Sequence, residues 1–112
     1  MITVMFLMTA KAELEEQCAR LAKEATASTR AEDAGCISYT FFRRSDDTRQ
    51  LMLFEQWRDA DALAAHIERL KRVYGPPDDS EAYPPAHHRR RLPKAFLDHF
   101  DRTEAVRYEV ID

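Results

Sequence analysis

The sequence of 112 residues contains only two cysteines and two glycines. Two thiols, Cys18 and Cys36, are too few for a disulfide framework, and their spacing matches no zinc motif. Two isolated glycines cannot build the glycine-rich loop that binds a phosphate or a dinucleotide. We therefore expect two free thiols in a reducing, cytoplasmic environment, and we predict no metal site.

Long apolar runs and an excess of positive charge are also missing. No stretch approaches the roughly 20 apolar residues that cross a bilayer. The apolar N-terminus has no positive region ahead of it and leads directly into acidic sequence, which favours a strand over a signal peptide. The net charge of -3 gives no reason to expect nucleic acid as a partner. We expect one cytoplasmic domain over residues 1–112 that binds neither membrane nor nucleic acid.

The apolar patterns predict four strands and two helices. Thr9 and Asp59 are expected to cap the N-termini of the two helices, and Gly35 is expected to take a positive φ angle after the first helix. Alternation of side chains indicates the strands, and a spacing of three and four residues indicates the helices. The predicted strands cover residues 2–8, 36–43, 50–57 and 105–111, and the predicted helices cover 10–29 and 60–74.

This order, strand-helix-strand-strand-helix-strand, is typical of the ferredoxin-like α+β fold with an antiparallel sheet. Such a sheet carries its helices on one face. The predicted strands are nevertheless apolar on both faces, so a second structure must cover the other face. The economical solution is a homodimer in which the sheets of two subunits close face to face.

An insert, residues 75–103, separates the second helix from the last strand. It holds all five prolines of the chain. A structureless loop of this length is unusual in a compact domain. The apolar residues Phe96, Leu97 and Phe100 after Pro93 predict an extra helix near residues 93–101. We expect the insert to fold over an opening or across a partner subunit.

Three residues are candidates for catalysis. His66 lies beside the apolar stripe of the second helix, where it either is a hydrogen-bonded core residue or faces a cavity and accepts a substrate proton near neutral pH. Tyr39 and Trp57 lie on the neighbouring strands of the hairpin. Their rings can stack on a flat phenolic ligand, and the Tyr hydroxyl can bond to it. Packing in the core or at a dimer interface is the alternative for both.

A second set is expected to bind the substrate. Glu55 shares a strand face with Trp57, and its carboxylate either joins an ion pair with Arg43, Arg107 or a partner chain, or contacts the substrate. Aromatic side chains complete this predicted substrate-binding set: Phe41, Tyr74 and Tyr108.

The insert carries a basic run. His87 and His88 have no metal-ligand spacing. They are followed by three arginines, residues 89–91. These arginines are a solvated surface, pair with the nearby acidic residues 78–81, or hold an anionic ligand.

Residues 35–70 resemble the antibiotic biosynthesis monooxygenase family. The resemblance rests on Gly-x-x-x-Tyr at 35–39, Glu-x-Trp at 55–57 and the helical His66. It implies a dimeric α+β barrel that oxidises a small aromatic phenol or quinol with dioxygen, with no flavin, haem or metal cofactor. In that scheme His66 is the base or proton shuttle, Trp57 a stacking surface and Tyr39 a hydrogen-bond partner. The alternative function is a non-catalytic dimeric barrel that binds a small hydrophobic ligand or acts as an interaction module.

A related branch of that superfamily degrades haem. It uses an Asn on the first strand, a Trp on the second helix and a His about three turns later. Here the first strand has no Asn, His66 occupies the Trp position and Pro76 the His position. The sequence therefore disfavours haem degradation.

Overall fold

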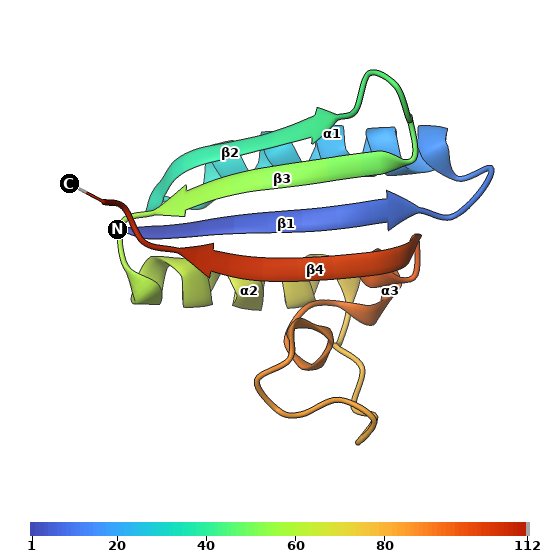
Figure 1. The fold of residues 1–112 in the computed structure, drawn as a ribbon. Coiled ribbons are helices and arrows are strands. Elements are labelled where there is room, and N and C mark those ends of the chain that lie inside the picture. The colour runs from blue at the N-terminus through green and yellow to red at the C-terminus, as the bar shows by residue number, and fades with distance from the viewer. Residues whose placement is uncertain (112) are drawn as a thin grey trace.

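The computed structural model describes residues 1–111 and has a four-stranded antiparallel sheet with two long helices (Figure 1). The sheet order is β2-β3-β1-β4, and all neighbouring strands are antiparallel. Both long helices lie behind the sheet in Figure 1. This confirms the predicted ferredoxin-like α+β fold. The elements are β1 (Ile2–Ala10), α1 (Glu15–Glu32), β2 (Cys36–Arg43), β3 (Gln50–Trp57), α2 (Ala60–Tyr74), η1 (His88–Arg90), α3 (Lys94–Leu97) and β4 (Phe100–Tyr108).

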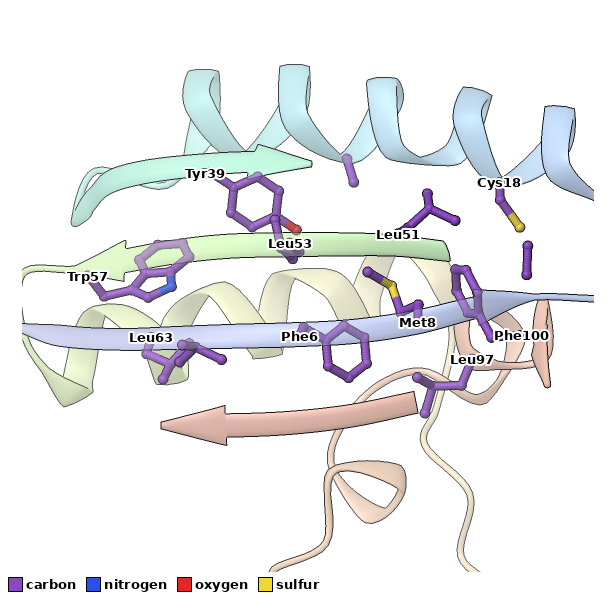
Figure 2. Close-up of a cluster of buried hydrophobic side chains, with 13 residues drawn as sticks. Phe6, Met8, Cys18, Tyr39, Leu51, Leu53, Trp57, Leu63, Leu97 and Phe100 are labelled. Carbon is purple, nitrogen blue, oxygen red and sulfur yellow. The ribbon is translucent and has the colours of Figure 1, made fainter. Parts of the chain in front are cut away.

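The core lies between the sheet and the helices (Figure 2). Alternate residues of β1 and β3 point into it, including Phe6, Met8 and Leu53. Trp57 and Leu97 are completely buried. Because strand side chains alternate between the two faces, the residues between these positions lie on the opposite face of the sheet.

Several element ends differ from the predictions: those of β1, α1 and β4. The prediction that Thr9 caps the first helix is wrong: β1 continues to Ala10, and the Thr9 hydroxyl donates a 2.9 Å hydrogen bond to the Gln50 side chain. Helix α1 begins at Glu15 without a side-chain cap. Strand β4 begins at Phe100, five residues before the predicted start at 105, because Phe100 pairs with Ala10 at the end of β1. By contrast, the Asp59 cap is confirmed, with its carboxylate accepting from the Ala62 amide at 2.8 Å.

Gly35 is needed for a close approach and not for an unusual backbone angle. The predicted positive φ is wrong, since Gly75 is the glycine that has one, at the C-terminus of α2. A Cβ atom placed on Gly35 would lie 2.2 Å from the Cβ of Ala62 in α2. The chain entering β2 therefore touches the first turn of α2 directly.

Substitutions at Gly35 and Ala62 test this contact between β2 and α2. Gly35→Ala is expected to destabilise the protein by about 1–3 kcal/mol, because the added methyl group forces β2 and α2 apart. The free energy of unfolding in urea measures the effect. Ala62→Gly should cost about 1 kcal/mol alone, as glycine does in helices. If the added methyl group acts by colliding with Ala62, Gly35→Ala lowers the free energy of unfolding much less in the Ala62→Gly background. An equal loss of unfolding free energy in both backgrounds contradicts this explanation.

The insert folds into two short helices. The helix predicted near 93–101 is a single turn, α3, because the chain turns into β4 at Phe100. The 3-10 helix η1 precedes it. His88 fastens this part to the sheet: its Nε2 lies 2.7 Å from the Thr103 hydroxyl, and its ring meets Phe6 edge-on at 5.6 Å.

The sheet face away from the helices is open and carries a group of apolar side chains. Phe42 is 51% exposed and Leu7 44%, and Met5, Met52 and Phe54 are half-buried beside them. The strand register places these side chains in adjacent rows across β2, β3 and β1. Nothing within residues 1–111 covers this face, which we call the open sheet face. Among the same residues, no helix is long and apolar enough to span a membrane.

Candidate active site

A cavity lies on the helix side of the sheet, where α2, β4 and the insert meet. Its volume is about 100 Å³, and apolar cavities of roughly 150 Å³ are known to hold a benzene ring. Most of the surface is apolar, from residues such as Leu63, Ile67, Leu70 and Phe96. Seven polar or charged side chains interrupt it: Tyr39, Glu55, His66, Tyr74, His88, Arg91 and Arg107. The cavity thus combines an apolar surface with a few polar groups, as binding sites for small ligands do.

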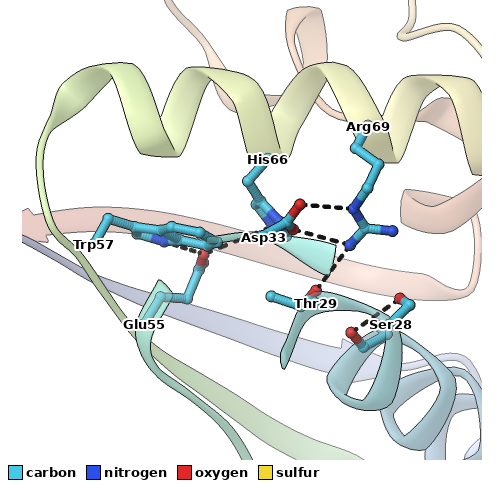
Figure 3. Close-up of polar contacts among 8 residues, drawn as sticks. Ser28, Thr29, Asp33, Glu55, Trp57, His66 and Arg69 are labelled. Atoms are coloured by element: carbon cyan, nitrogen blue, oxygen red, sulfur yellow. Dashed lines mark hydrogen bonds and ion pairs between the residues drawn. The ribbon is translucent and has the colours of Figure 1, made fainter. Parts of the chain in front are cut away.

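His66 is held by a buried hydrogen-bond network (Figure 3). Its Nδ1 lies 2.6 Å from the Asp33 carboxylate, and its side chain is only 3% exposed. The same carboxylate receives two hydrogen bonds from the guanidinium of Arg69, at 2.8 and 2.9 Å. Arg69 also donates to the Thr29 hydroxyl at 3.2 Å. Asp33 follows the end of α1, so the network joins α1 to α2.

The charges in this network fix the tautomer of His66. Burial opposes ionisation of Asp33, but the hydrogen bonds from Arg69 and His66 outweigh it and lower the pKa of Asp33. An ionised carboxylate only accepts hydrogen bonds, so the proton of the His66 ring is on Nδ1. Burial lowers the pKa of His66 despite the opposing effect of Asp33. The imidazole is therefore neutral at pH 7, with the lone pair of Nε2 available as a base.

Glu55 faces the other nitrogen of His66. Its Oε1 lies 4.0 Å from Nε2 and accepts a 2.9 Å hydrogen bond from the indole N–H of Trp57. Burial raises the pKa of Glu55 to about 7, although the hydrogen bond from Trp57 opposes the shift. A carboxyl group with this pKa carries a proton part of the time at neutral pH and can donate it in a hydrogen bond.

The two predicted aromatic partners pack around His66. The Trp57 ring lies 4.4 Å from the His66 ring and is fully buried, so it supports His66 from behind and does not line the cavity. Tyr39 meets His66 edge-on at 5.4 Å and does line the cavity. Burial raises the pKa of Tyr39 well above its usual value, which keeps its hydroxyl protonated. Tyr39 is thus a hydrogen-bond donor next to a base.

The structure brings together most of the residues predicted to bind substrate, but not all. Glu55 and Tyr74 line the cavity, and the Tyr74 ring contacts Phe96 of α3 at 6.0 Å. Phe41 packs edge-on against Tyr39 at 5.8 Å, outside the cavity. Tyr108 pairs with Thr3 and is 53% exposed on the open sheet face, on the opposite side of the sheet from His66. The structure offers no role at this cavity for Phe41 or Tyr108.

Two members of the site, Asp33 and Arg69, were missed from the sequence. The sequence around Asp33 indicated only the end of a helix. A signal existed in α2, where Arg69 follows His66 by three residues and so lies on the same helix face. A buried His and Arg on one face require an acidic partner, but nothing in the sequence says which of the many acidic residues supplies it.

The adjacent histidines of the insert also belong to the cavity region. The rings of His87 and His88 stack at 4.3 Å, and His88 alone lines the cavity. Within residues 1–111, no group of three or more His, Cys, Asp or Glu side chains is arranged to hold a metal ion.

The comparisons with known proteins agree with this fold. The sequence model of the family described as antibiotic biosynthesis monooxygenase matches residues 1–70. These residues include Asp33, Glu55, Trp57, His66 and Arg69, whereas the insert and β4 lie outside the match. A search of curated proteins finds no match.

Three solved structures illustrate the likeness. A crystal structure of an antibiotic biosynthesis monooxygenase has a TM-score of 0.70 at 18% identity, covering 100% of both chains. A protein from Pseudomonas aeruginosa has a TM-score of 0.72 at 21% identity, covering 99% of this chain and 94% of its own. A Bacteroides thetaiotaomicron protein of unknown function, described as a possible oxidoreductase, has a TM-score of 0.66 at 20% identity, covering 97% and 96%. At these identities the likeness shows the fold.

Proposed function

Because the chain belongs to the antibiotic biosynthesis monooxygenase family, we propose that it is a cofactor-independent monooxygenase that oxidises a small aromatic phenol or quinol with dioxygen. The observation that carries the proposal is the pair formed by His66 and Glu55, a neutral imidazole and a carboxyl group with a pKa of about 7, whose facing atoms are 4.0 Å apart. Both line the same cavity of about 100 Å³.

The pair suits the removal of a phenolic proton. A phenol oxygen placed beside the pair, on the cavity side, can lie about 2.8 Å from both groups and hydrogen-bond to each. Nε2 of His66 takes the proton as a general base, and the protonated Glu55 donates a hydrogen bond to the phenolate oxygen. Asp33 keeps the proton on Nδ1 and stabilises the imidazolium that forms. The apolar surface keeps water away from the anion, which remains electron-rich.

The electron-rich anion then supplies the electrons for oxygen. It transfers one electron to dioxygen, giving a phenoxyl radical and superoxide, and the two radicals recombine to form a carbon–oxygen bond. Protonation gives a hydroperoxide on a ring carbon that still bears hydrogen. Loss of water from that carbon leaves a quinone, so one oxygen atom enters the product and the other leaves as water. The imidazolium of His66 and the hydroxyl of Tyr39 are the nearby proton donors.

Oxygen uptake with a panel of single-ring dihydroxy-aromatics tests the proposal. We expect one dioxygen consumed per quinone formed, at a rate proportional to protein concentration. A panel without turnover favours the second candidate, a non-catalytic barrel that binds a small hydrophobic ligand. The apolar cavity would serve that function equally, but it would not require a carboxyl group and a base in contact with the ligand.

We also propose that two subunits cover their open sheet faces by forming a homodimer. The proposal is supported by the apolar side chains in adjacent rows of this face, among which Phe42 and Leu7 are exposed. Contiguous apolar surfaces of this kind are rare on monomers and usually mark an interface. Tyr108, on the same face, would then lie at the interface.

The dimer is testable by light scattering after size exclusion. We expect the wild type to have twice the chain mass of 13.0 kDa at micromolar concentration. Leu7→Glu should give a monomer, because a buried and unpaired carboxylate destabilises the interface. The matched control is Ala64→Glu, which adds the same charge at an exposed position of α2 and should leave the dimer intact. A monomeric wild type would contradict the proposal.

A further inference from the structure

We propose that the substrate carries an anionic group, a carboxylate in the simplest case, which Arg91 and Arg107 bind while the aromatic ring occupies the cavity. The inference rests on the proposed function for the orientation of the ring, because it places the phenolic oxygen at His66. The anionic group itself is inferred from the two arginines.

The two arginines reach the cavity from different parts of the chain. Arg91 follows η1 in the insert, and Arg107 lies on β4. The register pairs Arg107 with Val4, a residue of the buried sheet face. The side chain of Arg107 therefore projects from the sheet face on which the cavity lies. Both side chains line the cavity together with His66 and Glu55, which stand on α2 and β3.

Neither guanidinium has an acidic partner within residues 1–111. Arginines that hold the fold have protein partners: Arg69 pairs with Asp33 at 2.8 Å and Arg49 with Asp101 at 2.6 Å, and Arg90 donates to the Tyr83 carbonyl at 2.8 Å. Among the same residues, no carboxylate lies within 4.0 Å of Arg91 or Arg107, and neither side chain donates a hydrogen bond to the protein. Two guanidinium groups at one cavity are therefore available for an anion, which arginine binds through paired hydrogen bonds.

The other groups around the cavity leave this positive charge uncompensated. Burial, together with the neighbouring His87, Arg89 and Arg91, lowers the pKa of His88 to about 4, so His88 is neutral at pH 7. Burial keeps the two tyrosines protonated and His66 unprotonated. Glu55, with its pKa of about 7, is the one lining residue that can ionise to an anion near neutral pH. Below pH 7 the cavity is thus net positive, and its charge comes from the two arginines.

The arrangement gives the ligand a direction. Its proton-donating end meets His66 and Glu55, its ring contacts the apolar residues of α2 and α3, and its anionic end meets Arg91 and Arg107. An aromatic acid with a ring hydroxyl, such as a dihydroxybenzoate, has these three features. A neutral hydroquinone has the first two only.

Calorimetric titration of the full chain with a matched pair of ligands tests the inference. The pair is 2,5-dihydroxybenzoate and 2,5-dihydroxybenzamide, which differ in charge and hardly in shape. Titrations at pH 6.5 without oxygen measure binding without turnover. We expect the carboxylate to bind at least about 10-fold more tightly than the amide. Arg91→Met and Arg107→Met should each remove most of this preference by weakening carboxylate binding, with amide binding unchanged.

Arg102→Met is the control, because Arg102 also lies on β4, is exposed and does not line the cavity. It changes the net charge equally and should not change the preference. Equal affinity of the wild type for both ligands, the same loss in all three variants, or no binding of either ligand at millimolar concentration overturns the inference. Oxygen uptake is read separately. Turnover without a preference for the acid would support the monooxygenase activity and contradict the anion site. A preference for the acid without turnover would support the anion site and contradict the monooxygenase activity.

Discussion

Replacing His66 with alanine is expected to reduce kcat for oxygen uptake by about 10²- to 10⁴-fold, the usual contribution of a general base. The reason is that no other lining group can replace Nε2 as the base. Tyr39 is held in its protonated form by burial, and Glu55, with a pKa of about 7, is needed in its protonated form and already accepts a hydrogen bond from Trp57. The Nε2 of His88, the other imidazole at the cavity, lies 2.7 Å from the Thr103 hydroxyl and is engaged there. Initial rates of oxygen uptake on one active substrate measure the effect.

The same variant separates catalysis from folding. Asp33 keeps both hydrogen bonds to Arg69 when the imidazole is removed, so the junction of α1 and α2 persists. Free imidazole added to the His66→Ala protein can enter the vacated space and should restore part of the rate. His99→Ala is the matched control, since His99 does not line the cavity, and it should keep the full rate. Unchanged turnover by His66→Ala would remove His66 from the mechanism.

The hairpin and the second helix could be predicted because their signals are local. Strands β2 and β3 have the predicted bounds, since alternation of aromatic and polar residues ends at a charged turn on one side and at a helix cap on the other. The cap, Asp59, is set by its own neighbour Ala62, three residues away. The topology then follows from the order of elements.

The ends of β1 and β4 could not be predicted because they depend on each other. Ala10 and Phe100 extend both strands by pairing across the sheet, and neither position carries a strong strand signal of its own. Phe100, on the apolar side of a predicted helix, is equally suitable for the buried side of a strand. Pairing between distant segments therefore overrode the local pattern.

In the candidate site, too, the individual residues could be predicted from local sequence, but their contacts could not. His66, Glu55 and Tyr39 could be found because each is a polar group among apolar neighbours, which requires a partner or a ligand. Their mutual arrangement could not, since Asp33 and His66 are 33 residues apart in the sequence and meet only through the packing of α1 against α2. The position of Trp57 could not be predicted either: its ring packs on His66 and does not line the cavity.

Glu55 offers the second large effect, and its sign depends on pH. The pKa of Glu55 is raised from 4.5 to about 7 by burial, so the folded protein holds this proton more tightly than the unfolded chain does. The resulting contribution to stability is complete below pH 4.5 and is lost as the pH rises through 7. The loss amounts to about 3 kcal/mol at pH 8.

Glu55→Gln is expected to avoid this loss. Glutamine has the shape of the protonated acid: its carbonyl oxygen can accept from the Trp57 indole, and its amide can donate into the cavity. Urea unfolding should give nearly equal stabilities for wild type and variant at pH 4, and an advantage of about 3 kcal/mol for Glu55→Gln at pH 8. Glu81→Gln, at an exposed position of the insert, should stay within about 0.5 kcal/mol of the wild type at both values.

The pH dependence of activity should also reflect the carboxyl proton of Glu55. The wild-type kcat/KM is expected to rise with pH as His66 becomes unprotonated, and to fall above pH 7 as Glu55 loses the proton that it donates to the phenolate. Glu55→Gln keeps a donor at every pH, so the fall above pH 7 should disappear while the rise remains. Glu55→Ala has no donor and should be slow throughout. If kcat/KM still falls above pH 7 in Glu55→Gln, another group supplies that proton. The role of Glu55 would then be structural, as the hydrogen-bond acceptor of the Trp57 indole.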